Sequence, residues 1–476
     1  SRDSPPMTPP NPSTRTLGVP SAQGITHSPT QLRGLPRNRS WGLLQELRRL
    51  EQSPGVYHGA MLLLAINFHA QLIADIREHG LRFNYHFLME PAVWHDVTTM
   101  WYIIFVVAAP LALLSYWITN LLLTSNLCSR VVTLTTHAVF ALVQIALPHL
   151  LLIRDQINPI ICGIASAAST CFALKTHSYI VRRTLNKGGA APGDLREIGH
   201  FLRFLFVPEL VYDENAMDKA YKDARVGTGR PPLAGEKLGK MRTGSTRNYS
   251  RARSRGIRFG FVFWNWVQGI ACLGWIAVVF CQQIAPVLIE AKTLVGVHSL
   301  QICVPANLCW FLAFYCVFKA NFSILAELTN YPVRRFYSDW WNATTVDDFW
   351  RRWNVPVHQF AVHHIFHPCI NELQMSPRAA GATVFVLSAL LHELTFAVAF
   401  ECPNCYFITL GMVLQVPLVE ASKNLEGSRR GNILVWLNFV LGITAMAHLY
   451  FYQWHRCCSD DDLVFQSFYR ESINAK

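Results

Sequence analysis

Long apolar segments, separated by short polar breaks, limit the folds available to this sequence. A helix needs roughly 20 residues to cross about 30 Å of hydrocarbon. Only 15% of the residues are charged, against about 25% in soluble domains. These features predict an all-α, polytopic membrane protein with about nine transmembrane helices, in the segments 57–76, 98–123, 131–153, 157–175, 259–284, 293–320, 379–400, 405–419 and 433–454.

Basic residues gather in two segments, and their placement predicts an orientation. Residues 178–258 hold 17 Lys or Arg against 8 Asp or Glu, and the first 56 residues hold 7 Arg against 3 acids. Lys and Arg beside spans mark the cytosolic side, and four spans separate the two segments. We therefore expect both in the cytosol, together with residues 321–378. No recognition motif accompanies the charge, so we expect no nucleic-acid partner.

The sequence divides into a membrane domain, 46–455, and flanking tails. Residues 1–45 contain eight prolines with many Ser and Thr, which predicts a disordered cytosolic tail. Residues 456–476 form an acidic tail that the span count places in the lumen. Within the basic loop 178–258, the polar stretch 213–254 reads as a mobile insertion. Cys402-x-x-Cys405 is compatible with a disulfide or with two thiols.

A histidine and a glutamate lie in the middle of a predicted span, in Ser388-Ala-Leu-Leu-His-Glu-Leu394. Ionisable residues are costly there unless they face a cavity or a partner, which makes His392 a functional candidate. A zinc-protease pattern needs a second His four residues on, but Phe396 stands there, and we expect no metal. His363, His364 and His367 lie beside a proline at a predicted membrane edge and are interpreted as interfacial residues.

The second unusual element is Phe336-Tyr-Ser-Asp-Trp-Trp-Asn342, followed by Trp353-Asn-Val-Pro-Val-His358. An interfacial aromatic belt would account for the rings. It would not account for the interleaved Asp and Asn residues, because buried polar groups need partners. The segment is therefore a second candidate for chemistry.

A buried imidazole can take a proton from an alcohol, whose oxygen then attacks a carbonyl. The sequence has no Gly-x-Ser-x-Gly elbow and no Cys evidently paired with a base, which favours direct transfer from an activated donor. An amide such as Asn354 could donate to the developing oxyanion. An alternative of another class is a transporter with a His392–Glu393 proton relay, which the absence of an inverted repeat disfavours.

At these residues the sequence resembles the membrane-bound O-acyltransferase superfamily, in the branch of the sterol and diacylglycerol O-acyltransferases. The resemblance rests on Phe336–Asn342, Trp353–His358 and Ser388–Glu393, in this order and spacing, and covers about residues 41–455. Phe201–Tyr212 resembles a further family segment. The chain departs from the family where 213–254 intervenes before the next span.

The resemblance implies a helical fold with an internal reaction tunnel in the endoplasmic reticulum membrane. Its co-substrate would be acyl-CoA, with no cofactor and no metal, and the chain would form a homodimer or homotetramer among membrane lipids. His392 would be the general base and Asn354 its catalytic partner. The implied substrate-binding residues are Phe336, Tyr337, Asp339, Trp340, Trp341, Asn342, Trp353, His358, Glu393 and Gln415.

The acyl acceptor is a sterol or diacylglycerol. Residues 57–117 and the ending Tyr450–His455 resemble the sterol enzymes, whereas Glu327–Asn330 and Leu414–Pro417 are shared by both groups. The sequence patterns favour transfer to a sterol 3-hydroxyl, giving a sterol ester and CoA. Diacylglycerol acylation to triacylglycerol is the alternative.

Overall fold

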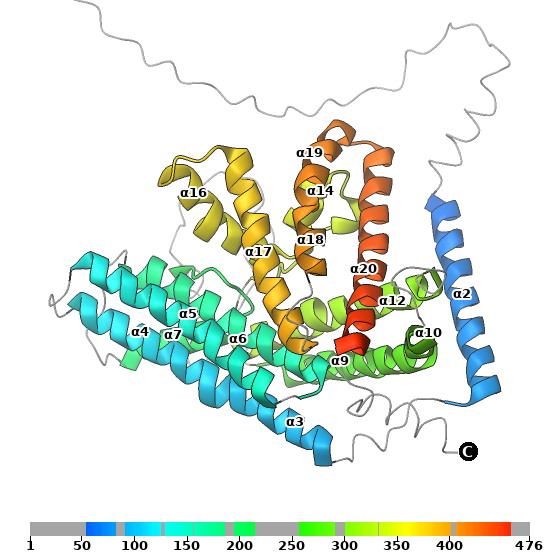
Figure 1. Ribbon diagram of the computed structural model, residues 1–476, viewed down its shortest axis with the longest axis horizontal. Helices are drawn as coiled ribbons and strands as arrows, with labels where there is room; N and C mark the ends of the chain where they lie inside the picture. The colour runs from blue at the N-terminus through cyan, green and yellow to red at the C-terminus, as the bar shows by residue number, and fades with distance from the viewer. Residues whose placement is uncertain are drawn as a thin grey trace, which may run out of the picture. The chain divides into compact units, whose positions relative to one another are not determined.

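The computed structural model describes residues 54–81, 91–124, 129–155, 157–185, 195–214, 257–290, 300–331, 333–400 and 406–457 (Figure 1). Regular structure in these ranges is helical throughout, without strands. The chain forms two compact units, Ser1–Ile66 and Asn67–Lys476. Of the first unit the structure describes the start of helix α2. The predicted tail 1–45, nearly all of the 213–254 insertion, the Cys402–Cys405 pair and the end of the chain lie outside the described residues.

The described elements are helices, and several of them continue into a π-helical turn, labelled η. In chain order they are α2 (Pro54–His79), α3 (Pro91–Tyr102), η3 (Ile103–Ala108), α4 (Ala109–Thr124), α5 (Arg130–Asp155), α6 (Pro159–Tyr179), η4 (Ile180–Leu185), α7 (Leu195–Phe206), α9 (Phe259–Val279), η5 (Phe280–Ile284), α10 (Ala285–Glu290), α12 (Cys303–Phe314), η6 (Tyr315–Asn321), α13 (Phe322–Leu328), the 3-10 turn η7 (Trp340–Asn342), α14 (Val346–Trp353), α15 (Val355–Ala361), η8 (Val362–Phe366), α16 (His367–Asn371), α17 (Pro377–Ala399), α18 (Phe407–Val413), α19 (Gln415–Ser422), the 3-10 turn η9 (Lys423–Leu425) and α20 (Arg429–Cys457).

Seven helical segments among the described residues are long and apolar enough to cross a membrane. They coincide with seven of the nine predicted spans and confirm a polytopic membrane protein. The other two predicted spans behave differently. The stretch 57–76 falls within α2, which is not among the seven, and 405–419 is divided at Leu414 into α18 and α19. Pro417 explains the division, because it has no N–H to donate to the carbonyl of Val413.

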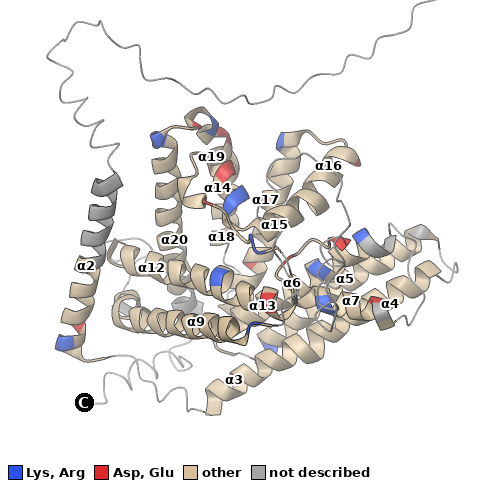
Figure 2. Cartoon of the chain, turned by 180° about the vertical axis from the view of Figure 1, so that it is seen from behind, with Lys and Arg blue, Asp and Glu red and all other residues tan. Residues whose placement is uncertain are grey.

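The surface of the spans is apolar, as a lipid-facing surface must be. Leu142, Ile160 and Phe259 are 69%, 69% and 75% exposed. Figure 2 shows that the long helices carry few charged side chains, which gather mainly near helix ends and in the connections. Between the spans, by contrast, hydrogen bonds join polar side chains. The amide of Asn307 on α12 donates to Thr444 Oγ1 on α20 over 3.2 Å.

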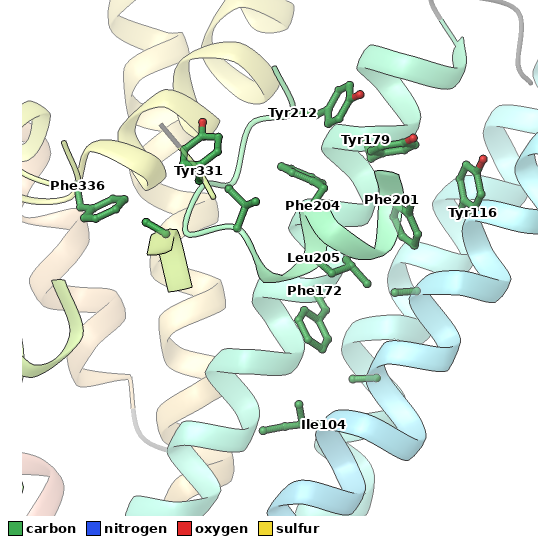
Figure 3. Packing of buried hydrophobic residues seen from close by; sticks show 14 of the residues in the cluster. Ile104, Tyr116, Phe172, Tyr179, Phe201, Phe204, Leu205, Tyr212, Tyr331 and Phe336 are labelled. Carbon is green, nitrogen blue, oxygen red and sulfur yellow. The ribbon is translucent and has the colours of Figure 1, made fainter. Parts of the chain in front are cut away.

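An aromatic cluster joins α7 and the turn after it to α4 and α6 (Figure 3). Phe201 stacks on Tyr116 with ring centroids 4.8 Å apart, and Tyr212 meets Tyr179 edge-on at 4.5 Å. All four side chains are buried. The segment Phe201–Tyr212 thus packs three aromatic side chains, those of Phe201, Phe204 and Tyr212, into the protein core.

The carboxyl end of α7 is held by a buried lysine of α6. The last carbonyls of a helix have no partner within it, and a cation is favourable there. Lys175 Nζ donates to the carbonyls of Phe204 (3.0 Å) and Leu205 (2.9 Å) and also to that of Val207. The side chain is only 6% exposed, so these carbonyls depend on it.

Replacing Lys175 with Met should lower the free energy of unfolding by about 3 kcal/mol, because the buried carbonyls lose their donor. Thermal unfolding in detergent would measure this as a lower midpoint. Lys319→Met is the matched control, since Lys319 is exposed, and its midpoint should stay at that of the wild type. Equal midpoints for the two variants would contradict the capping role.

Glu209, in the turn after α7, is buried, and its Oε1 accepts from the N–H of Leu210 over 3.2 Å. Burial raises the pKa of this carboxyl from 4.5 to about 7. Between those values the folded state binds more protons than the unfolded state, so stability falls as pH rises through this window.

Glu209→Gln removes the titrating group and should flatten this dependence. Relative to the variant, the wild type should lose up to about 3 kcal/mol between pH 4.5 and pH 8, from the size of the shift. Unfolding midpoints of both proteins across this range test the expectation. Parallel curves for the two proteins would show that Glu209 does not cause the dependence.

Candidate functional site

The predicted base His392 lies on α17, which begins at Ser376, whose hydroxyl accepts from the N–H of Ala379. His392 is half-buried, and its Nδ1 lies 2.7 Å from the carbonyl oxygen of Ser388. A carbonyl only accepts, so Nδ1 carries the proton and Nε2 carries the lone pair. The Ser388 hydroxyl also lies 3.4 Å from Nδ1. This is the tautomer that a general base requires.

Glu393, the next residue, is buried and bonded on both carboxylate oxygens. Oε1 accepts from the Tyr450 hydroxyl at 2.8 Å, and Oε2 accepts from the N–H of Thr409 at 2.9 Å. The Tyr450 oxygen in turn accepts from the N–H of Ile408 at 3.0 Å. Glu393, expected from the resemblance to bind substrate, thus holds α17 against α18 and α20.

The motif Phe336–Asn342, called the signature segment from here on, alternates between the protein interior and the surface. Phe336 and Trp340 are each 3% exposed, whereas Asp339, Trp341 and Asn342 are exposed. Two backbone bonds attach it to the chain around Asn354, from Ser338 N to Arg352 O (2.8 Å) and from Val355 N to Phe336 O (3.0 Å). The two predicted motifs therefore form one structural unit.

Helix α20 holds the same segment from the other side. The carbonyl of Trp341 accepts from Asn432 Nδ2 (3.0 Å) and from Trp436 Nε1 (3.1 Å). An aromatic cluster lies beneath, in which partly buried Tyr337 and Trp353 pack around Trp340. The buried indole N–H groups of Trp340 and Trp350 have no hydrogen-bond partner among the described residues. Buried donors usually have one, so these two groups are exceptions.

Asn354 caps the helical run that starts with α15. Its Oδ1 accepts from the N–H of Val357 at 3.2 Å, which leaves the Nδ2 donors outside the cap. The run continues through η8, which packs against α17, so Asn354 and His392 are carried by neighbouring helices. His358 lies one turn after Asn354 and is half-buried. Burial, and then the Arg351 charge, lower the pKa of His358 and favour the neutral imidazole.

Gln415 forms a reciprocal amide pair with Asn438 of α20. Its Nε2 donates to Asn438 Oδ1 over 3.3 Å, and Asn438 Nδ2 donates back to Gln415 Oε1 over 3.0 Å. The second donor of Gln415 reaches the carbonyl of Gly411 at 3.1 Å. The predicted substrate ligand Gln415 therefore joins α19 to α20.

One of the three histidines near Pro368 has an internal role. His364 Nε2 lies 2.9 Å from the Ser178 hydroxyl of α6, and its ring meets that of His177. Burial, chiefly, lowers the pKa of His364 to about 3. His363 and His367 are exposed. In the part of the chain that the structure describes, no group of three or more His, Cys, Asp or Glu could hold a metal ion.

Sequence reasoning missed the residues that support these groups, chiefly Tyr450, Asn432 and Asn438. Polar side chains within a span signal an internal partner, and this rule could have selected Asn438 and Tyr450. It does not identify which partner each one takes, because the partners come from other helices.

Comparison with known proteins finds a family that is similar in the region of this site. Residues 243–452 match the model of the membrane-bound O-acyltransferase family. The match contains the signature segment, Asn354, His392, Glu393 and Gln415. This part of the chain is therefore similar to that family, and it contains the motifs on which the resemblance rested.

Curated relatives match over a similar region. The chain is 34% identical to diacylglycerol O-acyltransferase 1C of Glycine max over 215 residues, which are 43% of this chain and 41% of that protein. It is 35% identical to diacylglycerol O-acyltransferase 1 of Arabidopsis thaliana, over 43% and 41% of the two chains. The protein of that name from Bos taurus is 31% identical, over 33% and 32%. The matched region thus spans less than half of each relative.

The cap at Asn354 predicts how two substitutions will differ in stability. Asn354→Ala should cost about 1 kcal/mol, the usual cost of losing an N-cap acceptor. Asn354→Asp keeps an oxygen for the N–H of Val357 and should unfold close to the wild type. Thermal unfolding of the three proteins measures the difference. If Asn354→Asp lowered the unfolding midpoint as much as Asn354→Ala, the Oδ1 bond would not stabilise α15.

Proposed function

We propose that this protein is an acyl-CoA-dependent O-acyltransferase that makes triacylglycerol from diacylglycerol and a long-chain acyl-CoA. The observation that carries the proposal is the His392 tautomer, in which Ser388 O binds Nδ1–H and Nε2 is left as the base. The family match over residues 243–452 supports the reaction class. The names of the relatives support the acceptor.

The proposed reaction needs one base and one oxyanion donor. His392 Nε2 takes the proton of the acceptor hydroxyl as its oxygen forms a bond to the thioester carbonyl carbon. An amide hydrogen of Asn354 Nδ2 stabilises the oxyanion. The C–S bond then breaks, and the CoA thiolate takes the proton from His392. The ester and CoA are the products, and no covalent acyl-enzyme forms.

The proposed acyl-CoA site has two parts, the exposed face of the signature segment and the aromatic cluster beneath it. The unpartnered indole N–H groups of Trp340 and Trp350 are hydrogen-bond donors, and amide and thioester carbonyl oxygens are acceptors that suit them. Asp339, Trp341 and Asn342 lie on the exposed side of the same segment. We place the pantetheine arm along this segment because it runs beside Asn354.

Diacylglycerol replaces sterol as the favoured acceptor. The sequence patterns of the opening and closing spans favoured sterol, but the three relatives named above are diacylglycerol O-acyltransferases. Residues 57–117, one of the two regions behind the sterol preference, lie outside the family match. We further propose the endoplasmic reticulum membrane as the location, and assembly as a homodimer or homotetramer.

The acceptor is tested by supplying purified protein with oleoyl-CoA and either diacylglycerol or a sterol. We expect labelled triacylglycerol from the first mixture and little sterol ester from the second. Sterol ester without triacylglycerol would reverse the assignment of the acceptor. If neither ester forms while the protein stays folded, the acyltransferase proposal fails.

His392→Ala should abolish acyl transfer while leaving the unfolding midpoint and the oligomer size unchanged. His364→Ala serves as a matched control for loss of a partly buried imidazole, because His364 contacts α6 rather than α17. It should retain turnover if it remains folded. Near-normal activity of His392→Ala would remove the proposed base.

A further inference from the structure

Three hydrogen bonds join Glu393, the residue after the proposed base His392, with helices α18 and α20. Glu393 accepts from Tyr450 and Thr409, and Tyr450 accepts from Ile408. We propose that Glu393 and Tyr450 are positioning residues for His392, which fix the rotation of α17 and so the direction of its imidazole. This inference rests on the proposed function.

The carboxylate is committed to the protein rather than to a substrate. Ile408 and Thr409 lie in the first turn of α18, where backbone N–H groups have no partner within the helix. The Tyr450 oxygen satisfies one of them and Glu393 satisfies the other. A carboxylate is also favourable at this end of a helix. Both oxygens of Glu393 thus have a protein donor, and the side chain is 7% exposed.

Because His392 and Glu393 are consecutive residues of α17, the bonds of Glu393 also affect the direction of His392. Consecutive residues point about 100° apart around a helix of 3.6 residues per turn. When α18 and α20 hold Glu393, the rotation of α17 about its axis is fixed. The direction of the His392 side chain, about 100° away around the helix, is then fixed as well. Lipid offers little hydrophobic force to select one rotation of a span, so polar bonds between helices are the available means.

The surroundings of Tyr450 allow its hydroxyl to be removed without disturbing packing. The ring is 2% exposed and lies against Phe396 and Phe400 of α17 and Phe407 of α18, with centroids 4.8, 5.5 and 5.7 Å away. Tyr450→Phe keeps these ring contacts and loses the hydroxyl bonds to Glu393 and Ile408. The matched control is Tyr406→Phe, because Tyr406 is 63% exposed just before α18.

The decisive experiment measures steady-state acyl transfer from oleoyl-CoA to diacylglycerol. Tyr450→Phe should lower kcat about 10- to 100-fold, the scale expected when a reacting group is displaced by about 1 Å. The KM for both substrates should stay within about twofold of the wild type. Tyr406→Phe should match the wild type. An unchanged kcat, or a raised KM at unchanged kcat, would overturn the positioning role.

A second pair of variants separates positioning from charge. Glu393→Gln keeps an oxygen for the N–H of Thr409 and an amide for the Tyr450 oxygen, so it should retain most of the turnover that Glu393→Ala loses. If Glu393→Gln had as little turnover as Glu393→Ala while keeping the wild-type oligomer size, the charge itself would be required. That result would overturn the inference. A wild-type protein that transfers no acyl group would instead refute the proposed function.

Discussion

Hydrogen bonds that polar side chains form with groups on other helices are the interaction on which this structure depends. Lipid competes with the interior for apolar side chains, so hydrophobic burial alone does not select one arrangement of spans. Lys175 holds the end of α7, and Asn307 joins α12 to α20. Glu393 joins α17 to α18 and α20. Each bond connects segments that are distant in sequence and selects one rotation of the helix that carries it.

Hydrogen bonds within helices and between backbone segments also hold the proposed site. The Ser388 carbonyl selects the tautomer of His392, and the backbone around Arg352 and Val355 holds the signature segment beside Asn354. Two residues expected to bind substrate, Glu393 and Gln415, have their side chains engaged by the protein. In the structure these side chains join helices, Glu393 to α18 and α20 and Gln415 to α20.

The fold also shows why short motifs identify a reaction class more readily than a substrate. The proposed base lies on α17 and its proposed partner lies in the segment from Phe336 to His358, and the chemistry proposed for them is the same for any alcohol. Selection of the alcohol depends on the shape of the space between helices. The patterns of residues 57–117 and of Tyr450–His455 favoured sterol, whereas the matched relatives are named for diacylglycerol.

The sequence by itself determined the class of fold and the candidate chemistry. Apolar length predicts spans because each backbone polar group in hydrocarbon must be satisfied within a helix, and a histidine in mid-span is costly without a role. Only the tertiary structure decided the rest. It divided 405–419 into two helices at Leu414, and it brought His364 within hydrogen-bond distance of Ser178 on α6. It also gave Glu393 its partners on α18 and α20. The reason is that a hydrogen bond between helices depends on their packing and rotation, which local patterns do not encode.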